Sequence, residues 1–186
     1  MIILPHREKF INKHFFELSI KEEDTVPDLK LFKTLNAYEQ FYLAETYNWD
    51  DGTEVLKWII ESPICDKGTA SLIFWSAEPD FYFDYTEKTI VDYEKDTFDL
   101  LQKIIKKYKN SEFNRSKIKF DPTLHGNKTD WKTELDIWEI PDELRKPTKG
   151  SELISLSNIK MKISHWCYVR KLKKRERRKA KRKNAT

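Results

Sequence analysis

Glycine is scarce in this sequence of 186 residues. The four glycines, Gly52, Gly68, Gly126 and Gly150, are too far apart to form the glycine-rich loop that cradles phosphates in Rossmann and P-loop folds. Because such folds cannot bind a nucleotide without that loop, the composition argues against both classes of nucleotide site. We therefore expect no nucleotide cofactor, and no other cofactor is implied by the residues.

Cysteine and histidine are also too few and too scattered to form a recognisable metal site. The two cysteines, Cys65 and Cys167, lie far apart, and the four histidines show no ligand-pair spacing. This pattern favours free thiols in a reducing cytoplasm and no metal site. A thiol beside a helix start, as predicted for Cys65, can act as a nucleophile. Without a histidine partner in a recognisable motif, a buried structural role is favoured, and we expect no enzymatic activity.

Long hydrophobic runs are missing as well. The apolar start, Met1–Leu4, is too short for a signal peptide and is followed by a proline and charged residues. No stretch approaches the roughly 20 apolar residues that a membrane-spanning helix needs. The sequence thus predicts a soluble, cytoplasmic protein without a membrane partner.

Charge is abundant but unevenly placed. Of the 35 basic residues, eleven lie between Arg170 and Lys183, together with a single acid. These eleven are Arg170, Lys171, Lys173, Lys174, Arg175, Arg177, Arg178, Lys179, Lys181, Arg182 and Lys183. Residues 1–169 then hold 24 basic and 30 acidic residues, six net negative charges, whereas the end of the chain carries ten net positive charges. We therefore predict an acidic domain over 1–169 and a basic tail over 170–186.

The basic tail has no apolar stripe that would lie in a membrane interface. Repulsion between like charges one helical turn apart predicts a helix with frayed ends or a disordered extension. Two functions stay open. The tail contacts nucleic acid or the ribosome through phosphate groups, or it is a solvated extension that folds back on the acidic domain.

Apolar residues at intervals of three to four predict an all-α or nearly all-α fold of short stacked helices in one compact domain. The predicted helices are 7–21, 28–47 with a break near 36, one ending near 61, one between 66 and Pro79, 87–109, a short one ended by Pro141, and a last one from 151. Asn36 with Glu39, Asp50 or Asp51, and Asp66 are the predicted N-caps. Alternation at Ile159, Met161 and Ile163 allows a strand within 151–169 instead.

Two motifs carry a family resemblance. Residues 47–52 read Tyr-Asn-Trp-Asp-Asp-Gly, and residues 65–75 begin Cys-Asp-Lys-Gly-Thr-Ala and end Ile-Phe-Trp. This pattern resembles the bacterial family called domain of unknown function 4274, over about 35–80 and more weakly to about 150. The family implies no catalytic residues. Small bacterial families of this kind include immunity proteins, so the resemblance implies an immunity-type inhibitor as one candidate.

Acidic and aromatic residues mark the predicted binding surface. Trp49, Asp50 and Asp51 occupy a turn, and Tyr82 and Tyr85, which we expect to be exposed, follow Pro79 among further acids. Helix capping by the aspartates is favoured over cation binding, because the ligand series of a calcium loop is missing. Aromatic anchors among acids favour a protein partner with a basic surface. We therefore predict a non-enzymatic protein-binding module, with tail-mediated nucleic-acid or ribosome binding as the alternative.

Overall fold

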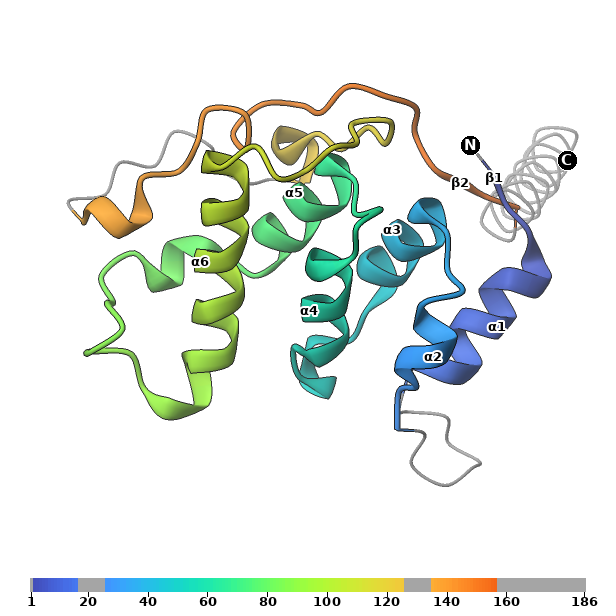
Figure 1. Cartoon of the computed structure of the whole chain (residues 1–186), viewed down its shortest axis with the longest axis horizontal. Helices are drawn as coiled ribbons and strands as arrows, with labels where there is room; N and C mark the ends of the chain where they lie inside the picture. Colours follow the sequence, from blue (N-terminus) through green and yellow to red (C-terminus); the bar gives the residue numbers. More distant parts are fainter. Residues whose placement is uncertain (1, 17–25, 126–134, 157–186) are drawn as a thin grey trace, which may run out of the picture.

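Six α-helices and a two-stranded sheet form the part of the chain that the computed structural model describes, residues 2–16, 26–125 and 135–156 (Figure 1). With 3₁₀ turns labelled η, the elements are β1 (Ile2–Ile3), α1 (Pro5–Phe15), α2 (Leu29–Phe32), α3 (Ala37–Thr46), η1 (Trp49–Asp51), α4 (Glu54–Glu61), α5 (Lys67–Ser76), η2 (Pro79–Tyr82), η3 (Asp92–Glu94), α6 (Lys95–Lys109), η4 (Pro122–His125), η5 (Asp136–Trp138) and β2 (Ile154–Ser155). The predicted all-α class is confirmed. The predicted domain boundary at 169 and the basic tail lie outside the described residues.

Local hydrogen bonds set the start of α3 as the sequence predicts. The Asn36 side chain accepts the backbone N–H groups of Tyr38 and Glu39, and the Glu39 carboxylate accepts the N–H of Asn36 at 2.9 Å. This capping box ends the run of α2 and opens a new helix, because the N-cap residue itself has an extended backbone. Arg7 from α1 reaches the same carboxylate and ties α1 to the start of α3.

Helix α6 starts later than the periodicity predicts. The helix begins at Lys95, whereas we expected it to begin at residue 87. The Thr89 hydroxyl accepts the backbone N–H of Thr86, and Val91 is extended. A side-chain hydroxyl that bonds the backbone offers a turn in place of a helix, which is the physical reason for the delay. From Phe98 onward the apolar residues at helical spacing are buried, namely Phe98, Leu101, Ile105 and Tyr108.

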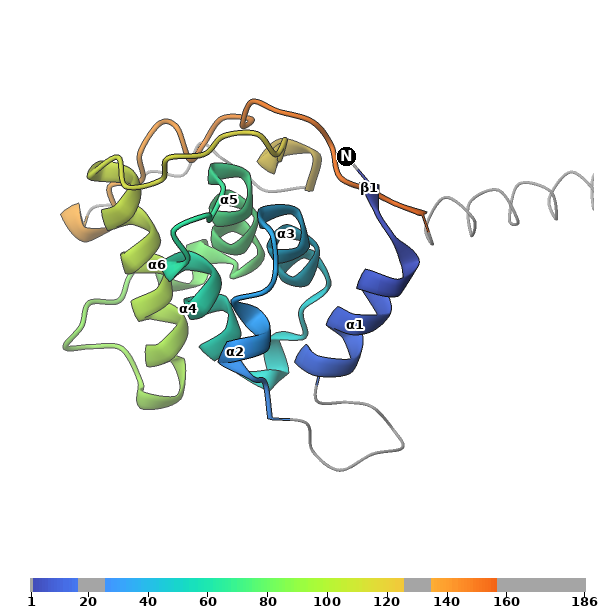
Figure 2. The ribbon, with the colours of Figure 1, turned by 45° about the vertical axis from the view of Figure 1, so that its right-hand side comes forward.

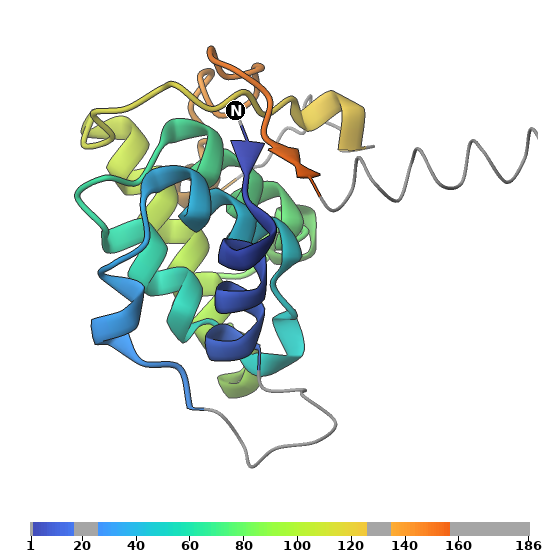
Figure 3. The same ribbon diagram turned by 90° about the vertical axis from the view of Figure 1, so that its right-hand side faces the viewer.

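The predicted helix from residue 151 is wrong at its start. Ser151 bridges to Ile118, and Ile154–Ser155 form β2, which pairs in parallel with β1 at the beginning of the chain. Figure 3 shows these two short strands side by side. Pairing with a segment 152 positions away satisfies the backbone hydrogen bonds here, and local periodicity carries no information about such a distant partner. Residues 157–169, including the helix-or-strand alternative, lie outside the described residues.

Helix α5 is the most enclosed helix of the described fold. Every residue from Gly68 to Trp75 is buried, although the sequence predicts only one inward side. Helices α3 and α6 pack against α5, and the extended segments before η4 and before β2 cross over the ends of these helices (Figure 2). The indole N–H of Trp75 donates to the Leu144 carbonyl at 2.8 Å and so joins α5 to the second crossing segment.

Candidate functional site

The Trp49–Gly52 turn is held by its own side chains. Asn48 accepts the backbone N–H of Asp50, and its amide donates to Asp51 Oδ1 at 3.0 Å. Gly52 has a φ of +81°, a conformation that disfavours residues with a Cβ atom. The predicted capping of α4 by Asp50 or Asp51 is wrong, because Thr53 occupies the N-cap and its side chain makes no capping bond. Both aspartates belong to η1 itself, two and three residues before the N-cap, too early to reach the free N–H groups of α4.

Asp66 caps α5 as predicted and also joins α5 to a distant segment. Its fully buried carboxylate accepts the N–H of Gly68 at 2.9 Å, of Lys117 at 2.7 Å and of Ile118 at 3.3 Å. A Cβ atom on Gly68 would lie 2.3 Å from the Ile118 carbonyl oxygen, so only glycine permits this contact. Sequence analysis missed the bonds from Asp66 to residues 117 and 118. The signal that could have found them was Gly68, because the first turn of a helix does not itself require a glycine.

Cys65 is enclosed beside this junction. Burial raises the pKa of its thiol from 9.0 to about 12, against a smaller opposing effect of the Lys107 ammonium. A nucleophilic cysteine needs a thiolate near neutral pH, and this environment disfavours the thiolate. The structure therefore supports the predicted buried, structural role of Cys65.

We expect Cys65 to resist alkylation in the folded protein. In a Cys167→Ser variant at pH 8, iodoacetamide should modify Cys65 more than tenfold slower without denaturant than in 6 M guanidinium chloride, because the raised pKa and burial both suppress reaction. Intact-mass spectrometry over time measures the rate. Comparable rates in both conditions would contradict the burial of this thiol.

Tyr82 and Tyr85, predicted as exposed anchors, are largely enclosed. Tyr82 is buried and its hydroxyl donates to the Glu94 carboxylate, which ties η2 to η3. Burial, followed by this hydrogen bond, raises the pKa of Tyr82 well above its ordinary value. Tyr85 is half-buried, and its carbonyl accepts the indole N–H of Trp138 at 3.0 Å. The expectation that both rings face solvent is wrong for Tyr82. The neighbouring acids indicated an exposed segment, whereas the contacts that bury Tyr82 come from residues distant in the sequence.

Two other rings of this region are exposed. Phe81 keeps 55% and Tyr93 83% of its surface accessible. Five carboxylates of the same segment are exposed and form no ion pair with any described residue: Glu78, Asp80, Asp84, Glu87 and Asp92. We call residues 78–94 the acidic-aromatic segment. Sequence analysis missed Phe81 and Tyr93, although the acids on both sides of Tyr93 were a signal for exposure.

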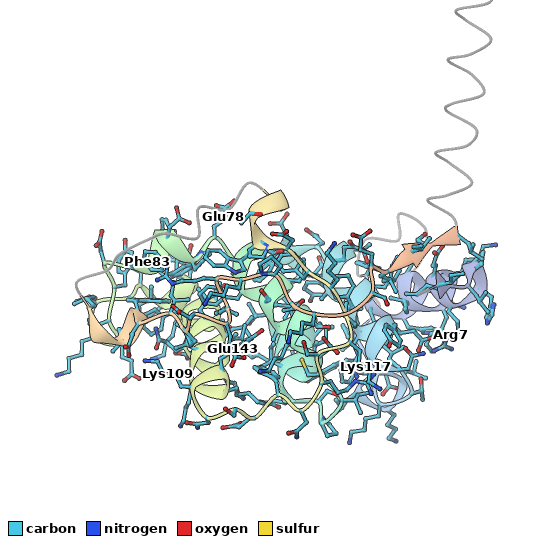
Figure 4. The ribbon with its side chains drawn as sticks, turned by 90° about the horizontal axis from the view of Figure 1, so that it is seen from above. Arg7, Glu78, Phe83, Lys109, Lys117 and Glu143 are labelled. Atoms are coloured by element: carbon cyan, nitrogen blue, oxygen red, sulfur yellow. The ribbon has the colours of Figure 1, made fainter. Side chains whose placement is uncertain are left out.

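The predicted surface divides into two separate groups. In Figures 1 and 2, η1 lies at the lower end of α4, while the loop from η2 to η3 lies beyond α6. Glu78, at the start of the acidic-aromatic segment, lies at the edge of the molecule seen from above (Figure 4). Asp50 is exposed and Trp49 half-buried, so η1 offers little aromatic surface. The acidic-aromatic segment is therefore the stronger candidate site.

The described residues offer no metal or membrane chemistry to this site. No group of three or more histidine, cysteine or acidic side chains is placed to hold a metal ion within them. None of their helices combines the length and apolar character needed to cross a membrane. The eleven basic residues predicted to bind nucleic acid, Arg170 to Lys183, lie outside the described part of the chain.

Comparison with known proteins finds a family match, which lies over the central helices. Residues 35–109 match the family described as Domain of unknown function (DUF4274), which confirms the predicted resemblance. The match covers α3 to α6, including both motifs and the acidic-aromatic segment. No curated protein and no solved structure matches the chain significantly.

Proposed function

We propose that this chain, whose residues 35–109 match that family of unknown function, is a non-enzymatic protein-binding module. The observation that carries the proposal is the pair of exposed rings, Phe81 and Tyr93, among five exposed carboxylates in one segment. Large aromatic rings are the side chains that anchor protein interfaces, and exposed rings cost solubility unless a partner covers them. The surrounding negative charge favours a partner with a basic surface.

Contacts within the fold also position part of this segment. The ring of Phe81 packs edge-on against Tyr82 with centroids 5.1 Å apart, and Tyr82 is bonded to Glu94 next to Tyr93. Because Tyr82 and Tyr85 pack against the Phe81 ring, this side chain loses little freedom on binding. An immunity-type inhibitor, with a basic toxin as its partner, is one module that would use such a surface.

We expect the double substitution Phe81→Ala and Tyr93→Ala to weaken partner binding about 30-fold or more, since losing a central anchor typically costs about 2 kcal/mol. The full chain, immobilised and exposed to a lysate of its native cells, would be compared with this variant by quantitative mass spectrometry. Val26→Ala, at a site that is 80% exposed and outside the segment, is the matched control. Capture of the same proteins by all three chains would refute the proposal.

A second candidate function is nucleic-acid or ribosome binding through the basic tail, favoured by eleven basic residues between positions 170 and 183. If the tail binds phosphates, log K should fall linearly with log salt, with a slope of about −0.9 per phosphate on a duplex. Fluorescence anisotropy with a labelled RNA duplex measures the slope. A chain truncated after residue 169 should lose the binding, and undiminished binding by the truncated chain would exclude the tail.

A further inference from the structure

An apolar hollow of about 490 Å³ lies between α2, α4 and the turn that follows α4, well separated from the acidic-aromatic segment. Figure 2 shows α2 and α4 side by side. The apolar walls are formed by Leu29, Phe32, Trp58, Pro63 and Ile64. Its size falls in the range of roughly 300–1,000 Å³ that is typical of small-molecule sites.

The aromatic wall is preformed. Phe32 of α2 and Trp58 of α4 contact each other with ring centroids 5.8 Å apart. At the base, the Gln40 side-chain amide donates to Ser62 Oγ at 3.0 Å, which fixes the turn after α4 against α3. A ligand would therefore meet a wall whose side chains are already positioned by the fold.

The mouth of the hollow carries a lysine ammonium that has no ion-pair partner among the described residues. Within this part of the chain, two charged residues line the hollow, Lys33 and Glu61. The Glu61 carboxylate pairs with Lys103 of α6, whereas Lys33 is exposed and forms no ion pair with any described residue. The charge available to a ligand at this mouth is thus an ammonium group.

We propose that this hollow binds a small amphiphilic carboxylate, whose apolar chain lies against Phe32 and Trp58 and whose carboxylate meets Lys33. The apolar walls exclude a fully polar ligand, because its polar groups would be buried without hydrogen-bond partners. The free ammonium favours an anionic end over a neutral or cationic one, because a charge-assisted hydrogen bond is stronger than a neutral one.

Isothermal titration calorimetry with the full chain tests the site with hexanoate, heptanoate and octanoate. Affinity should rise about fourfold per methylene, the gain from burying one CH₂ group. Octanoate should bind about tenfold tighter than 1-octanol, and octylammonium weaker than either. Absence of saturable octanoate binding to the folded protein, or equal affinity for octanoate and octylammonium, would overturn the proposal.

Substitutions at the mouth locate the site. Lys33→Gln should bring the affinities for octanoate and octanol to within twofold of each other. Lys30→Gln, in α2 three residues before Lys33 but not in the lining, should keep the tenfold preference for octanoate. Leu29→Glu places a carboxylate at the mouth and should weaken octanoate binding more than tenfold. Because Leu29 is exposed, we expect this variant to fold, which circular dichroism checks.

An unchanged preference for octanoate over octanol in Lys33→Gln would refute the assigned orientation. The Phe81→Ala, Tyr93→Ala variant should bind octanoate normally, which keeps this test independent of the proposed function.

Discussion

Replacing Asp66 by alanine is expected to lower the free energy of unfolding by about 3–5 kcal/mol, because three backbone N–H groups lose a buried charged acceptor at once. Native domains are stable by only about 5–15 kcal/mol, so this loss removes a large share of the total. For a chain of this length the melting temperature should fall by roughly 10 °C. Urea denaturation measures the free energy of unfolding and thermal unfolding measures the melting temperature, each followed by circular dichroism.

Two further variants serve as comparisons. One removes a single acceptor oxygen from Asp66, and the other removes an aspartate at the surface. Asp66→Asn keeps one acceptor oxygen and should lose about half as much stability, since a carboxamide presents N–H groups where the second oxygen stood. Asp142→Ala removes an exposed partner of Lys146 and should change the free energy by less than about 0.5 kcal/mol. A loss below about 1 kcal/mol in Asp66→Ala would show that the junction between α5 and residues 117–118 contributes little.

Replacing Trp138 by alanine is expected to cost about 3–5 kcal/mol, the usual range for deleting a fully buried large ring. The ring lies 5.4 Å from Phe98 and 5.5 Å from Phe83 between centroids, and its indole N–H holds the Tyr85 carbonyl. The cavity would open directly beneath the acidic-aromatic segment. We therefore expect hydrogen exchange at residues 83–94 to increase, relative to the unsubstituted chain, more than it does in α3. Mass spectrometry on the folded variant measures this increase.

Trp138→Phe is the matched comparison for this effect. Phenylalanine retains most of the ring contacts but leaves the Tyr85 carbonyl without its donor, so we expect a smaller loss of about 1–2 kcal/mol. If the acidic-aromatic segment binds the partner, Trp138→Ala should also weaken capture, although Trp138 is fully buried. Hydrogen exchange that rises equally in α3 and in residues 83–94 would contradict a local role of Trp138.

The two family motifs serve the fold in this structure. Asn48, Asp51 and Gly52 bond or shape their own turn, and Asp66 with Gly68 seats a distant backbone segment. The Asn48 amide and the Asp66 carboxylate are engaged in internal hydrogen bonds instead of facing an open site. Both proposed binding sites accordingly lie outside the motifs, at the acidic-aromatic segment and at the hollow beside Trp58.

The sequence by itself determined the features that depend on neighbours within one or two helical turns. The all-α class, the capping box at Asn36, the Asp66 cap and the inward face of α6 follow from spacing, because capping bonds and helix faces connect residues three or four positions apart. The structural role of Cys65 followed from the same local pattern, since it precedes a capped helix without a partner residue.

Only the tertiary structure decided where distant segments meet. Residues 154–155 became a strand because β1 offered its backbone, and Gly68 proved essential because Ile118 crosses it. Tyr82 turned inward because Glu94 and Trp138 surround it, which left Phe81 and Tyr93 at the surface. Each of these outcomes depends on a contact between residues far apart in the sequence, which local spacing does not predict. Whether a ring or an acidic side chain is buried depends on such contacts and not on its residue type alone.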